Sequence, residues 1–252
     1  MNLRNSASKV LGSRLGQNAK EPVRKLFEAC GYDLVPLDTG TGPLLQTLLR
    51  DSRVATLVDV GANQGQYARR MRLLGFTGNM ISFEPGREAF RLLQRNAAAD
   101  PLWRAEQLAV GRTTGTTVLN VSANSVSSSL LSVEKLHVDS APESRIKGTE
   151  QVHMKTLDSA LQSQELGPAW VKIDTQGYEL EVLGGAARTL QQAVVVQAEL
   201  SLAPLYQDQP QFLTVLELLV SRGFSTFDLI PGFRSASDYR LLQCDVIAVR
   251  RN

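Results

Sequence analysis

From residue 54 onward, short apolar runs alternate with segments whose apolar residues recur at helical spacing, and this alternation limits the fold more than any other feature. The apolar runs are rich in Val, Ile and Leu, as expected of parallel strands that helices cover on both faces. The predicted strands are residues 54–60, 79–85, 104–110, 169–175, 193–200, 224–230 and 241–249. The predicted helices between them are residues 66–75, 87–98, 180–192 and 211–223. The sequence therefore predicts an α/β fold with a doubly wound, mostly parallel sheet.

The last two predicted strands and the block 111–158 depart from this alternation. No convincing helix separates strands 224–230 and 241–249, and a parallel pair would need a crossover connection. The connection PGFRSASDYR instead favours an antiparallel hairpin. Residues 111–158 are rich in Ser, Thr and Asn, with one further short strand predicted at 150–157. We interpret this block as an insertion that lies near the functional site.

Residues 1–50 are predicted to form an N-terminal helical arm, ahead of a single domain over residues 51–252. Short helices are predicted at 22–31 and 43–50, the second with Pro43 in its first turn. The first 20 residues carry basic side chains and no acidic one, and they lack the apolar core of a signal peptide. Two interpretations remain open for this stretch. It is a solvated arm, or it makes a weak membrane-surface contact through an apolar stripe of Val10, Leu11 and Leu15.

The composition excludes several classes of protein. Hydrophobic residues make up 43% and charged residues 21% of the chain, as in an ordinary soluble globular protein. A formal net charge of +2 gives no reason to expect a nucleic-acid partner. No apolar run is long enough to predict a membrane span. Cys30 and Cys244 lie outside any CxxC or Cys/His cluster, so no zinc site or disulfide framework is predicted, and we expect a cytoplasmic location.

The turn after the first predicted strand reads DVGANQG and indicates a ligand site. In an open parallel sheet, ligands bind at the carboxyl ends of the strands. Gly61 and Gly65 would let the backbone approach a ligand, and the following helix would direct its free N–H groups there. A dinucleotide site calls for GxGxxG, which GANQG does not match. Asp59 would repel a pyrophosphate, and it suits a ligand with an amino group and a cationic centre.

Glu84 closes the second predicted strand in ISFEP, where its carboxylate would accept hydrogen bonds from both hydroxyls of a ribose. NAD and S-adenosylmethionine both carry a ribose, so Glu84 alone does not choose between them. Together with Asp59 and the GANQG turn, it favours S-adenosylmethionine. A nicotinamide-dependent oxidoreductase remains the alternative, and a purely structural role in a turn or cap stays open for each carboxylate.

Four motifs in this order, LVDVGANQGQY, ISFEP, NSVSSSL and VKIDTQGYELEVLGGA, resemble those of the FkbM-type methyltransferases. The resemblance covers about residues 50–250. It implies an S-adenosylmethionine-dependent O-methyltransferase, in a family of which many members act on sugars or natural products. It also implies a Rossmann-like methyltransferase fold, with a seven-stranded, mostly parallel sheet whose last strand is antiparallel.

The resemblance also implies which residues bind the cofactor. Glu84 would hold the ribose, and Pro85 would shape the turn after it. Residues 108–115 would lie beside the adenine, and the chain has Ala109 and Val110 where many related enzymes place an acid or an amide. Adenine recognition is therefore expected to be mainly apolar and backbone-mediated. The methionine part of the cofactor would be lined by Asp59, Gly61, Asn63 and Gly65.

Two acids that end later strands, Asp174 and Glu199, are the main catalytic candidates. Since a sugar hydroxyl is a poor nucleophile, a base or a divalent metal would help the transfer. Asp174 could be this base, could contact the cofactor amine, or could cap the following helix. An acid that closes a buried strand, as Glu199 does, is costly unless it is paired. The two carboxylates together could hold Mg²⁺, and His137 is a further candidate base, with His153 less favoured.

The polar block 120–137 is expected to be a lid on the acceptor side, with a solvated loop as the alternative. Its Asn124, Ser127 and Ser128 would bind hydroxyls of substrate or cofactor, and Tyr206 from a later loop would help to frame the acceptor. The lid would be anchored by apolar side chains, Val126, Leu130 and Leu131. The expected acceptor is a small molecule, a glycan or a glycolipid. A catalytically inactive, methyltransferase-like binding subunit remains a third possibility.

Overall fold

The computed structural model of the protein describes residues 40–251. The predicted helix at 22–31 and the apolar stripe of Val10, Leu11 and Leu15 lie outside the described residues. The chain divides into two compact units, Met1–Leu44 and Leu45–Asn252, and the fold described below is that of the second unit. The helix predicted at 43–50 is present as α3 (Gly42–Asp51).

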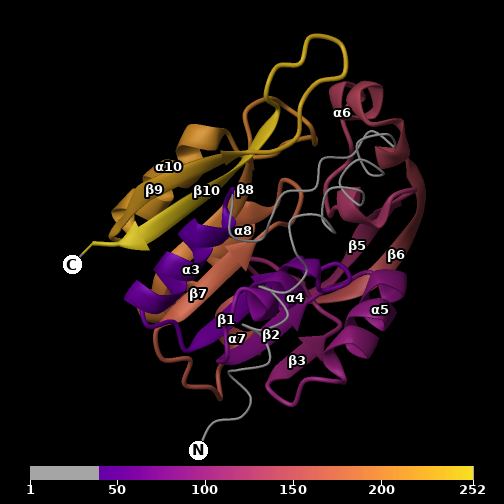
Figure 1. The fold of residues 1–252 in the computed structure, drawn as a ribbon. Coiled ribbons are helices and arrows are strands. Elements are labelled where there is room, and N and C mark those ends of the chain that lie inside the picture. Colours follow the sequence, from indigo (N-terminus) through magenta and orange to yellow (C-terminus); the bar gives the residue numbers. More distant parts are fainter. Residues whose placement is uncertain (1–39, 252) are drawn as a thin grey trace, which may run out of the picture. The chain divides into compact units, whose positions relative to one another are not determined.

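The main sheet has seven strands in the order β3-β2-β1-β7-β8-β10-β9 (Figure 1). Strand β10 pairs antiparallel with both of its neighbours, and the other pairs are parallel. The predicted mostly parallel sheet and its antiparallel C-terminal hairpin are therefore confirmed. The strands are β1 (Thr56–Val60), β2 (Asn79–Phe83), β3 (Trp103–Glu106), β7 (Ala169–Ile173), β8 (Ala193–Ser201), β9 (Phe224–Pro231) and β10 (Gln243–Arg250).

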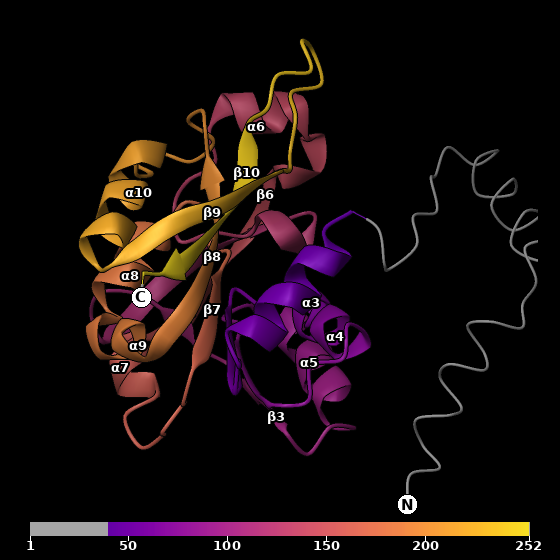
Figure 2. The same ribbon diagram turned by 60° about the vertical axis from the view of Figure 1, so that its left-hand side comes forward.

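Helices cover this sheet on both faces. Figure 2 shows α8, α9 and α10 on one face of the sheet and α4 and α5 on the other. Every residue of the central strands β1 and β7 is buried, which explains why apolar residues predominate in both. The helices are α4 (Gln66–Leu73), α5 (Arg87–Ala97), α7 (Leu157–Ala160), α8 (Glu179–Gly184), α9 (Ala187–Gln192) and α10 (Phe212–Ser221).

The helix predicted over 180–192 is divided into α8 and α9. Gly185 stands at the break, where a Cβ atom would come within 2.1 Å of the Gly111 carbonyl oxygen. The two segments of backbone touch there, so no side chain can be accommodated at this position. The predicted continuous helix was wrong, and the contact that requires Gly185 involves a residue distant in sequence.

The strand predicted over 104–110 is likewise two strands. Residues 103–106 pair with β2 in the main sheet, whereas β4 (Ala109–Val110) pairs with β6 (Ile146–Lys155) in a second sheet. This second sheet has the order β4-β6-β5, and β5 (Gly115–Ser122) runs antiparallel to β6. The Ser/Thr-rich start of the insertion is therefore a regular strand, which the sequence pattern did not predict. Short helical turns complete the insertion, η1 (Ser125–Ser127), α6 (Lys135–Ser140) and η2 (Pro142–Ser144).

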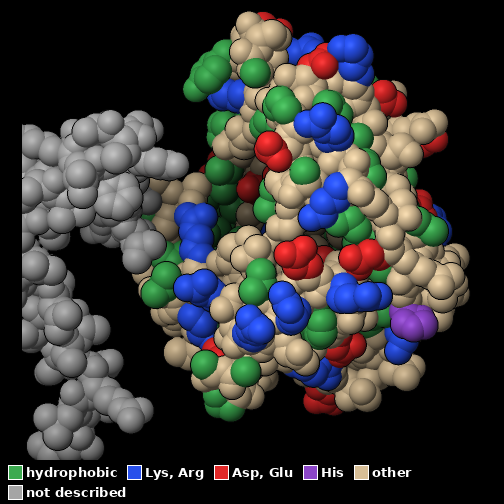
Figure 3. Space-filling model, turned by 90° about the vertical axis from the view of Figure 1, so that its right-hand side faces the viewer, with side chains coloured by type: hydrophobic (Ala, Val, Ile, Leu, Met, Phe, Trp, Pro, Cys, Tyr) green, Lys and Arg blue, Asp and Glu red, His purple; other side chains and the backbone are tan. Residues whose placement is uncertain are grey.

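Two further features of the described residues are the distribution of charge on the surface and the length and apolar content of the helices. On the face drawn in Figure 3, Lys and Arg side chains lie among Asp and Glu side chains. None of the helices within residues 40–251 combines the length and the apolar content that crossing a bilayer requires.

Candidate functional site

A cavity of about 370 Å³ opens at the carboxyl ends of the parallel strands. This volume lies within the range of roughly 300–1,000 Å³ that small-molecule sites occupy. Its walls come from the loops after β1, β2 and β7, from β8 and β10, and from the insertion. Several predicted site residues meet in these walls, namely Gly61, Asn63, Glu84, Pro85, Ala109, Val110, Ser128, Asp174 and Glu199.

The glycine turn between β1 and α4 is shaped by contacts within the chain. Gly61 has a φ of 76°, and a Cβ atom there would lie 1.9 Å from the Asp174 carbonyl oxygen. Gly65 has a φ of 83° and faces the Trp103 ring, which a Cβ would approach to 2.6 Å. Gly61 lines the cavity but Gly65 does not. Gly65 was predicted to contact the ligand, but it lies outside the cavity. The packing of α4 against β3 requires glycine at this position.

Glu84 is buried at the end of β2, with only 7% of its surface exposed. Its Oε2 accepts a hydrogen bond from the Asn63 backbone N–H at 2.8 Å, and its Oε1 accepts one from Gly86 N–H at 2.8 Å. Burial raises the pKa of Glu84 to about 7, against the lowering effect of these two hydrogen bonds. Asn63 itself has a left-handed backbone, with a φ of 49°. The carboxylate is thus held rigidly beside the turn, at the position predicted for ribose recognition.

Asp59 was predicted to contact the ligand directly, but it lies behind the cavity wall. It is fully buried, and its carboxylate oxygens have no hydrogen-bond partner. Burial raises the pKa of Asp59 above its ordinary value. The nearest cation is Lys172 of β7, whose Nζ lies 3.5 Å from Asp59 Oδ1. Asp59 and Lys172 stand side by side in register on neighbouring strands.

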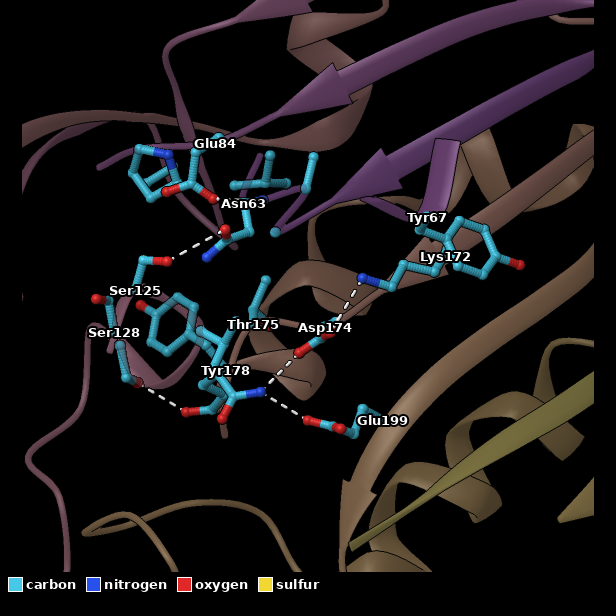
Figure 4. Close-up of a pocket in the computed structure, with 18 of the residues that line it drawn as sticks. Asn63, Tyr67, Glu84, Ser125, Ser128, Lys172, Asp174, Thr175, Tyr178 and Glu199 are labelled. Carbon is cyan, nitrogen blue, oxygen red and sulfur yellow. Dashed lines mark hydrogen bonds and ion pairs between the residues drawn. The ribbon is translucent and has the colours of Figure 1, made fainter. Parts of the chain in front are cut away.

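Lys172 connects this buried acid to the cavity. Its Nζ donates to Asp174 Oδ2 at 3.1 Å and lies 5.5 Å from the centre of the Tyr67 ring (Figure 4). Burial acts to lower the pKa of Lys172, but the charges of Asp174 and Asp59 outweigh it and raise the pKa above its ordinary value. Lys172 is therefore a permanent cation between two carboxylates.

Gln176 joins the two predicted catalytic acids. Its Nε2 donates to Asp174 Oδ1 at 2.7 Å and to Glu199 Oε2 at 2.6 Å, as the dashed lines in Figure 4 show. Its Oε1 accepts a hydrogen bond from the Tyr206 hydroxyl at 2.7 Å. Gln176 has a φ of 56°, a left-handed conformation that is uncommon for a residue with a side chain. Both carboxylates are therefore held by one buried amide.

Asp174 does not cap the helix that follows it. Helix α8 begins at Glu179, five residues further on, and Glu179 itself organises the intervening turn. Its Oε1 accepts hydrogen bonds from the backbone N–H groups of Thr175 and Gly177, at 3.0 Å and 3.1 Å. Burial raises the pKa of Glu179 to about 7. This turn leaves the Asp174 side chain at the cavity, with 30% of its surface exposed.

The surroundings of Glu199 disfavour its charged form. Burial, followed by the negative charges of Asp174 and Asp245, raises the pKa of Glu199 well above its ordinary value. Its Oε2 accepts hydrogen bonds from Gln176 and from Gln243 Nε2, the latter at 3.1 Å. A carboxylate with a raised pKa binds a proton more readily than an exposed one does.

The insertion supplies an apolar wall and a polar rim. Ala109, Leu119 and Leu130 pack in one small cluster with Tyr178, and all four line the cavity. Ser125, Val126 and Ser128 lie along its edge, and Ser125 Oγ donates to Asn63 Oδ1 at 3.3 Å. This contact ties the insertion to the glycine turn (Figure 4). Val126 is 56% exposed, so the expectation that it anchors the block was wrong, although Leu130 and Leu131 do pack against buried clusters.

Four predicted residues lie behind the walls. Asn124 Oδ1 accepts from the Ser127 backbone N–H at 3.0 Å, so this pair forms the cap of η1. Tyr206 is 1% exposed, and its ring meets the His137 ring edge-on at 5.1 Å. Burial lowers the pKa of His137 to about 4, which keeps the imidazole neutral. The structure thus separates His137 from the cavity by the Tyr206 layer, away from any base position, while Asn124, Ser127 and Tyr206 support the wall from outside.

The acids do not form a metal site. Among the described residues, no group of three or more His, Cys, Asp or Glu side chains could hold a metal ion. Asp174 and Glu199 were candidates to hold Mg²⁺ together. Both oxygens of Asp174 instead face donors, Gln176 and Lys172, and Glu199 Oε2 faces two amide donors. The residues present therefore do not fit a magnesium ion.

Three of the polar cavity residues that were not predicted leave a signal in the sequence. Lys172, Gln197 and Asp245 each interrupt an otherwise apolar strand, in AWVKI, VVVQAEL and QCDVIAV. Burying a polar side chain in a strand is costly without a partner, so such interruptions mark candidate site positions. Tyr67 and Gln176 left no comparable signal, because they lie in a helix and a turn.

A model of the family described as the methyltransferase FkbM domain matches residues 59–226. Comparison with curated proteins found no match.

Solved structures similar to this chain include an FkbM methyltransferase from Methylobacillus flagellatus KT, with 17% identity and a TM-score of 0.47 over 80% of this chain. The match spans 47% of that chain, so this protein covers about half of its length. A putative O-methyltransferase from Klebsiella pneumoniae has 10% identity and a TM-score of 0.47, over 98% of this chain and 96% of that one. The magnesium protoporphyrin IX methyltransferase from Synechocystis PCC 6803, solved with bound SAM, has 9% identity and a TM-score of 0.43. The match covers 83% of this chain and 77% of that one.

Proposed function

The chain belongs to the FkbM methyltransferase family, and from this premise we propose that it transfers a methyl group from S-adenosylmethionine to a hydroxyl group of a sugar, glycolipid or glycosylated metabolite. One observation carries the proposal. A single cavity brings together a buried carboxylate beside a glycine turn, an apolar wall, and a pair of carboxylates held by one amide. The first two suit a nucleoside, and the third suits a hydroxyl that must lose a proton.

The cofactor would lie along the loops after β2 and β1. The Glu84 carboxylate, fixed by Asn63 and Gly86, would accept hydrogen bonds from the ribose hydroxyls. Ala109, Val110 and Leu119 would cover the adenine on the apolar side. The cofactor supplies an activated methyl group on a cationic sulfur. The protein's part is to place that group against the acceptor oxygen and to exclude water.

Glu199 is the residue we assign to take the proton of the acceptor hydroxyl. Its Oε2 is occupied by Gln176 and Gln243, which leaves Oε1 for the acceptor. Its raised pKa lets it hold the proton after transfer, when the acceptor oxygen has formed its bond to the methyl carbon. Asp174, beside the cation Lys172, would orient the acceptor as a fixed hydrogen-bond acceptor. No step requires a metal ion.

A small-molecule or glycan acceptor agrees better with the surface than a nucleic acid does. The formal net charge is +2, and acidic and basic side chains are mixed on the face in Figure 3. Recognition of a nucleic-acid backbone relies on clustered Lys and Arg side chains.

Binding and turnover test the proposal separately. Thermal denaturation with S-adenosylhomocysteine should raise the melting temperature, and NAD at the same concentration should not. Mass spectrometry of a cell extract incubated with protein and methyl-labelled cofactor should reveal a labelled product. Glu199→Gln should abolish that product while keeping S-adenosylhomocysteine binding, whereas Glu217→Gln, an exposed change of the same kind on α10, should change neither. Stabilisation by NAD alone would refute the cofactor assignment, and a fully active Glu199→Gln variant would refute the base.

A further inference from the structure

The cavity follows the order of the strands along the carboxyl edge of the sheet. Glu84 follows β2, Gly61 follows β1 and Asp174 follows β7, while Glu199 and Asp245 lie opposite each other on β8 and β10. Figure 4 shows Glu84 on one side of the cavity and Tyr67, Lys172 and Glu199 on the other. Because the proposed nucleoside contacts occupy the loops after β2 and β1, the end toward β8 and β10 remains for the acceptor. We call it the β8–β10 end, and it is formed by Tyr67, Arg70, Lys172, Gln197, Glu199 and Asp245.

The polar groups of the β8–β10 end are held in place by buried amides. The Tyr67 hydroxyl donates to Gln197 Oε1 at 2.6 Å, and both Gln197 and Asp245 line the cavity. Gln197 and Gln243 are each only 4% exposed. Gln243 holds Glu199 Oε2 from behind. This support fixes the orientation of the half-buried Glu199 carboxylate before any ligand arrives.

The carboxylates of Glu199 and Asp245 at this end accept hydrogen bonds. An ionised carboxylate has no hydrogen to donate, and the Tyr67 hydroxyl is already used by Gln197. The ammonium group of Lys172 is directed to Asp174 and Asp59. A ligand that satisfies Glu199 Oε1 and the Asp245 carboxylate must therefore supply donors, which are hydroxyl or ammonium groups.

The charge of this end disfavours an anion. Asp174, Glu199 and Asp245 oppose Lys172 and Arg70, and the buried Asp59 lies directly behind Lys172. Burial, together with the charge of Asp174, raises the pKa of Asp245 as well as that of Glu199. A phosphate or carboxylate would add a further negative charge to a site whose own acids already repel one another.

We propose that the β8–β10 end binds the methyl acceptor as a polyhydroxylated ring without an anionic group, that an amino substituent strengthens binding, and that Asp245 sets this charge preference. The inference rests on the proposed function, because it places the acceptor beside the cofactor. Asp245 contacts the acceptor in this assignment, and Glu199 takes the proton.

Three probes that differ in charge test the assignment on the protein saturated with S-adenosylhomocysteine. They are methyl glucoside, glucosamine and glucose 6-phosphate, titrated at pH 7.5 and followed by amide chemical shifts in NMR. Glucosamine should bind tightest and glucose 6-phosphate weakest, with shifts in β8 and β10. Asp245→Asn should reduce the preference for glucosamine over methyl glucoside by about tenfold, the equivalent of roughly 1.4 kcal/mol. Glu217→Gln, which removes an exposed charge from α10, should leave the ranking unchanged.

The outcomes separate this inference from the proposed function. If S-adenosylhomocysteine itself fails to bind, the proposed function falls. If it binds, the inference is overturned by equal or tighter binding of glucose 6-phosphate, by the absence of any probe binding, or by an unchanged ranking in Asp245→Asn. Should Asp245→Asn not fold, the ranking of the three probes on the unaltered protein still decides, because a site without charge preference would bind all three alike.

Discussion

Replacing Lys172 by Met should destabilise the protein strongly at neutral pH and much less in acid. The substitution keeps the apolar stem and removes the ammonium group that lies between Asp59 and Asp174. Asp59 has 1% of its side chain exposed and no hydrogen bond, so it would be left as an uncompensated buried charge. Asp174 is 30% exposed and can be solvated by water. The cost therefore comes mainly from Asp59, and breaking a buried pair from one side costs about 3–5 kcal/mol.

The pH dependence of this loss follows from the protonation of Asp59. Burial already raises the pKa of Asp59, and removal of the Lys172 charge raises it further. A folded carboxyl with a raised pKa binds more protons than the unfolded chain at pH values between its unfolded and folded pKa, so stability falls as pH rises through that window. Lowering the pH protonates Asp59 in the folded variant and relieves the penalty. The difference in stability between variant and parent should therefore shrink from pH 7 to pH 5.

Urea unfolding of the parent, Lys172→Met and Asp59→Asn/Lys172→Met measures this effect. The double variant removes both charges, and it should regain most of the lost stability at pH 7. Lys135→Met, which breaks an exposed ion pair with Asp139, is the matched control and should change stability little. A loss below about 1 kcal/mol at pH 7 would contradict the reasoning. An equal loss at pH 7 and pH 5, or no recovery in the double variant, would do the same.

Three further results are expected. Glu84→Gln should weaken S-adenosylhomocysteine binding roughly tenfold to a hundredfold in calorimetry, since a hydrogen bond to a charged group contributes about 1.5–3 kcal/mol. The parent's affinity should fall as pH drops below about 7, where Glu84 takes up a proton, and a pH-independent parent would refute this role. Gly61→Ala should lower the melting temperature more than Gly75→Ala. Both glycines have positive φ, but only at Gly61 would a new Cβ lie 1.9 Å from a carbonyl oxygen. Equal shifts in melting temperature would argue against that clash. S-adenosylhomocysteine should slow amide exchange over residues 120–137, whose Ser125, Ser128 and Leu130 line the cavity, and unchanged exchange would make the block a bystander.

Local pattern alone predicted the main sheet, and the reason is burial on both faces. Strands β1 and β7 have all five residues buried, so apolar residues predominate in each and the sequence displays this directly. The C-terminal hairpin was predictable because its connection is too short for a crossover. Glu84, Asp174 and Glu199 could be placed at the cavity from sequence, since the carboxyl ends of parallel strands meet at one edge of the sheet.

The insertion was predicted less well, because its structure depends on partners distant in sequence. Strand β5 is rich in Thr, Asn and Ser and only two of its eight residues are buried, so its sequence resembles a loop until β6 pairs with it. Val126 was expected to anchor the block and is instead exposed at the cavity edge. Apolar residues in a polar segment indicate that something packs nearby, but they do not indicate which of them it covers.

The sequence by itself determined the α/β class, the strand that carries each acid, and the turn that brings Gly61 and Asn63 to the ligand edge. Only the tertiary structure decided which of these side chains face the cavity. Asp59 turns behind the wall to Lys172, His137 lies under Tyr206, and Gln176 joins Asp174 to Glu199. Periodicity reports which face of an element is buried, because it is a property of neighbours along the chain. Whether a buried polar side chain meets another side chain or open space depends on strands and loops that are neighbours only after folding.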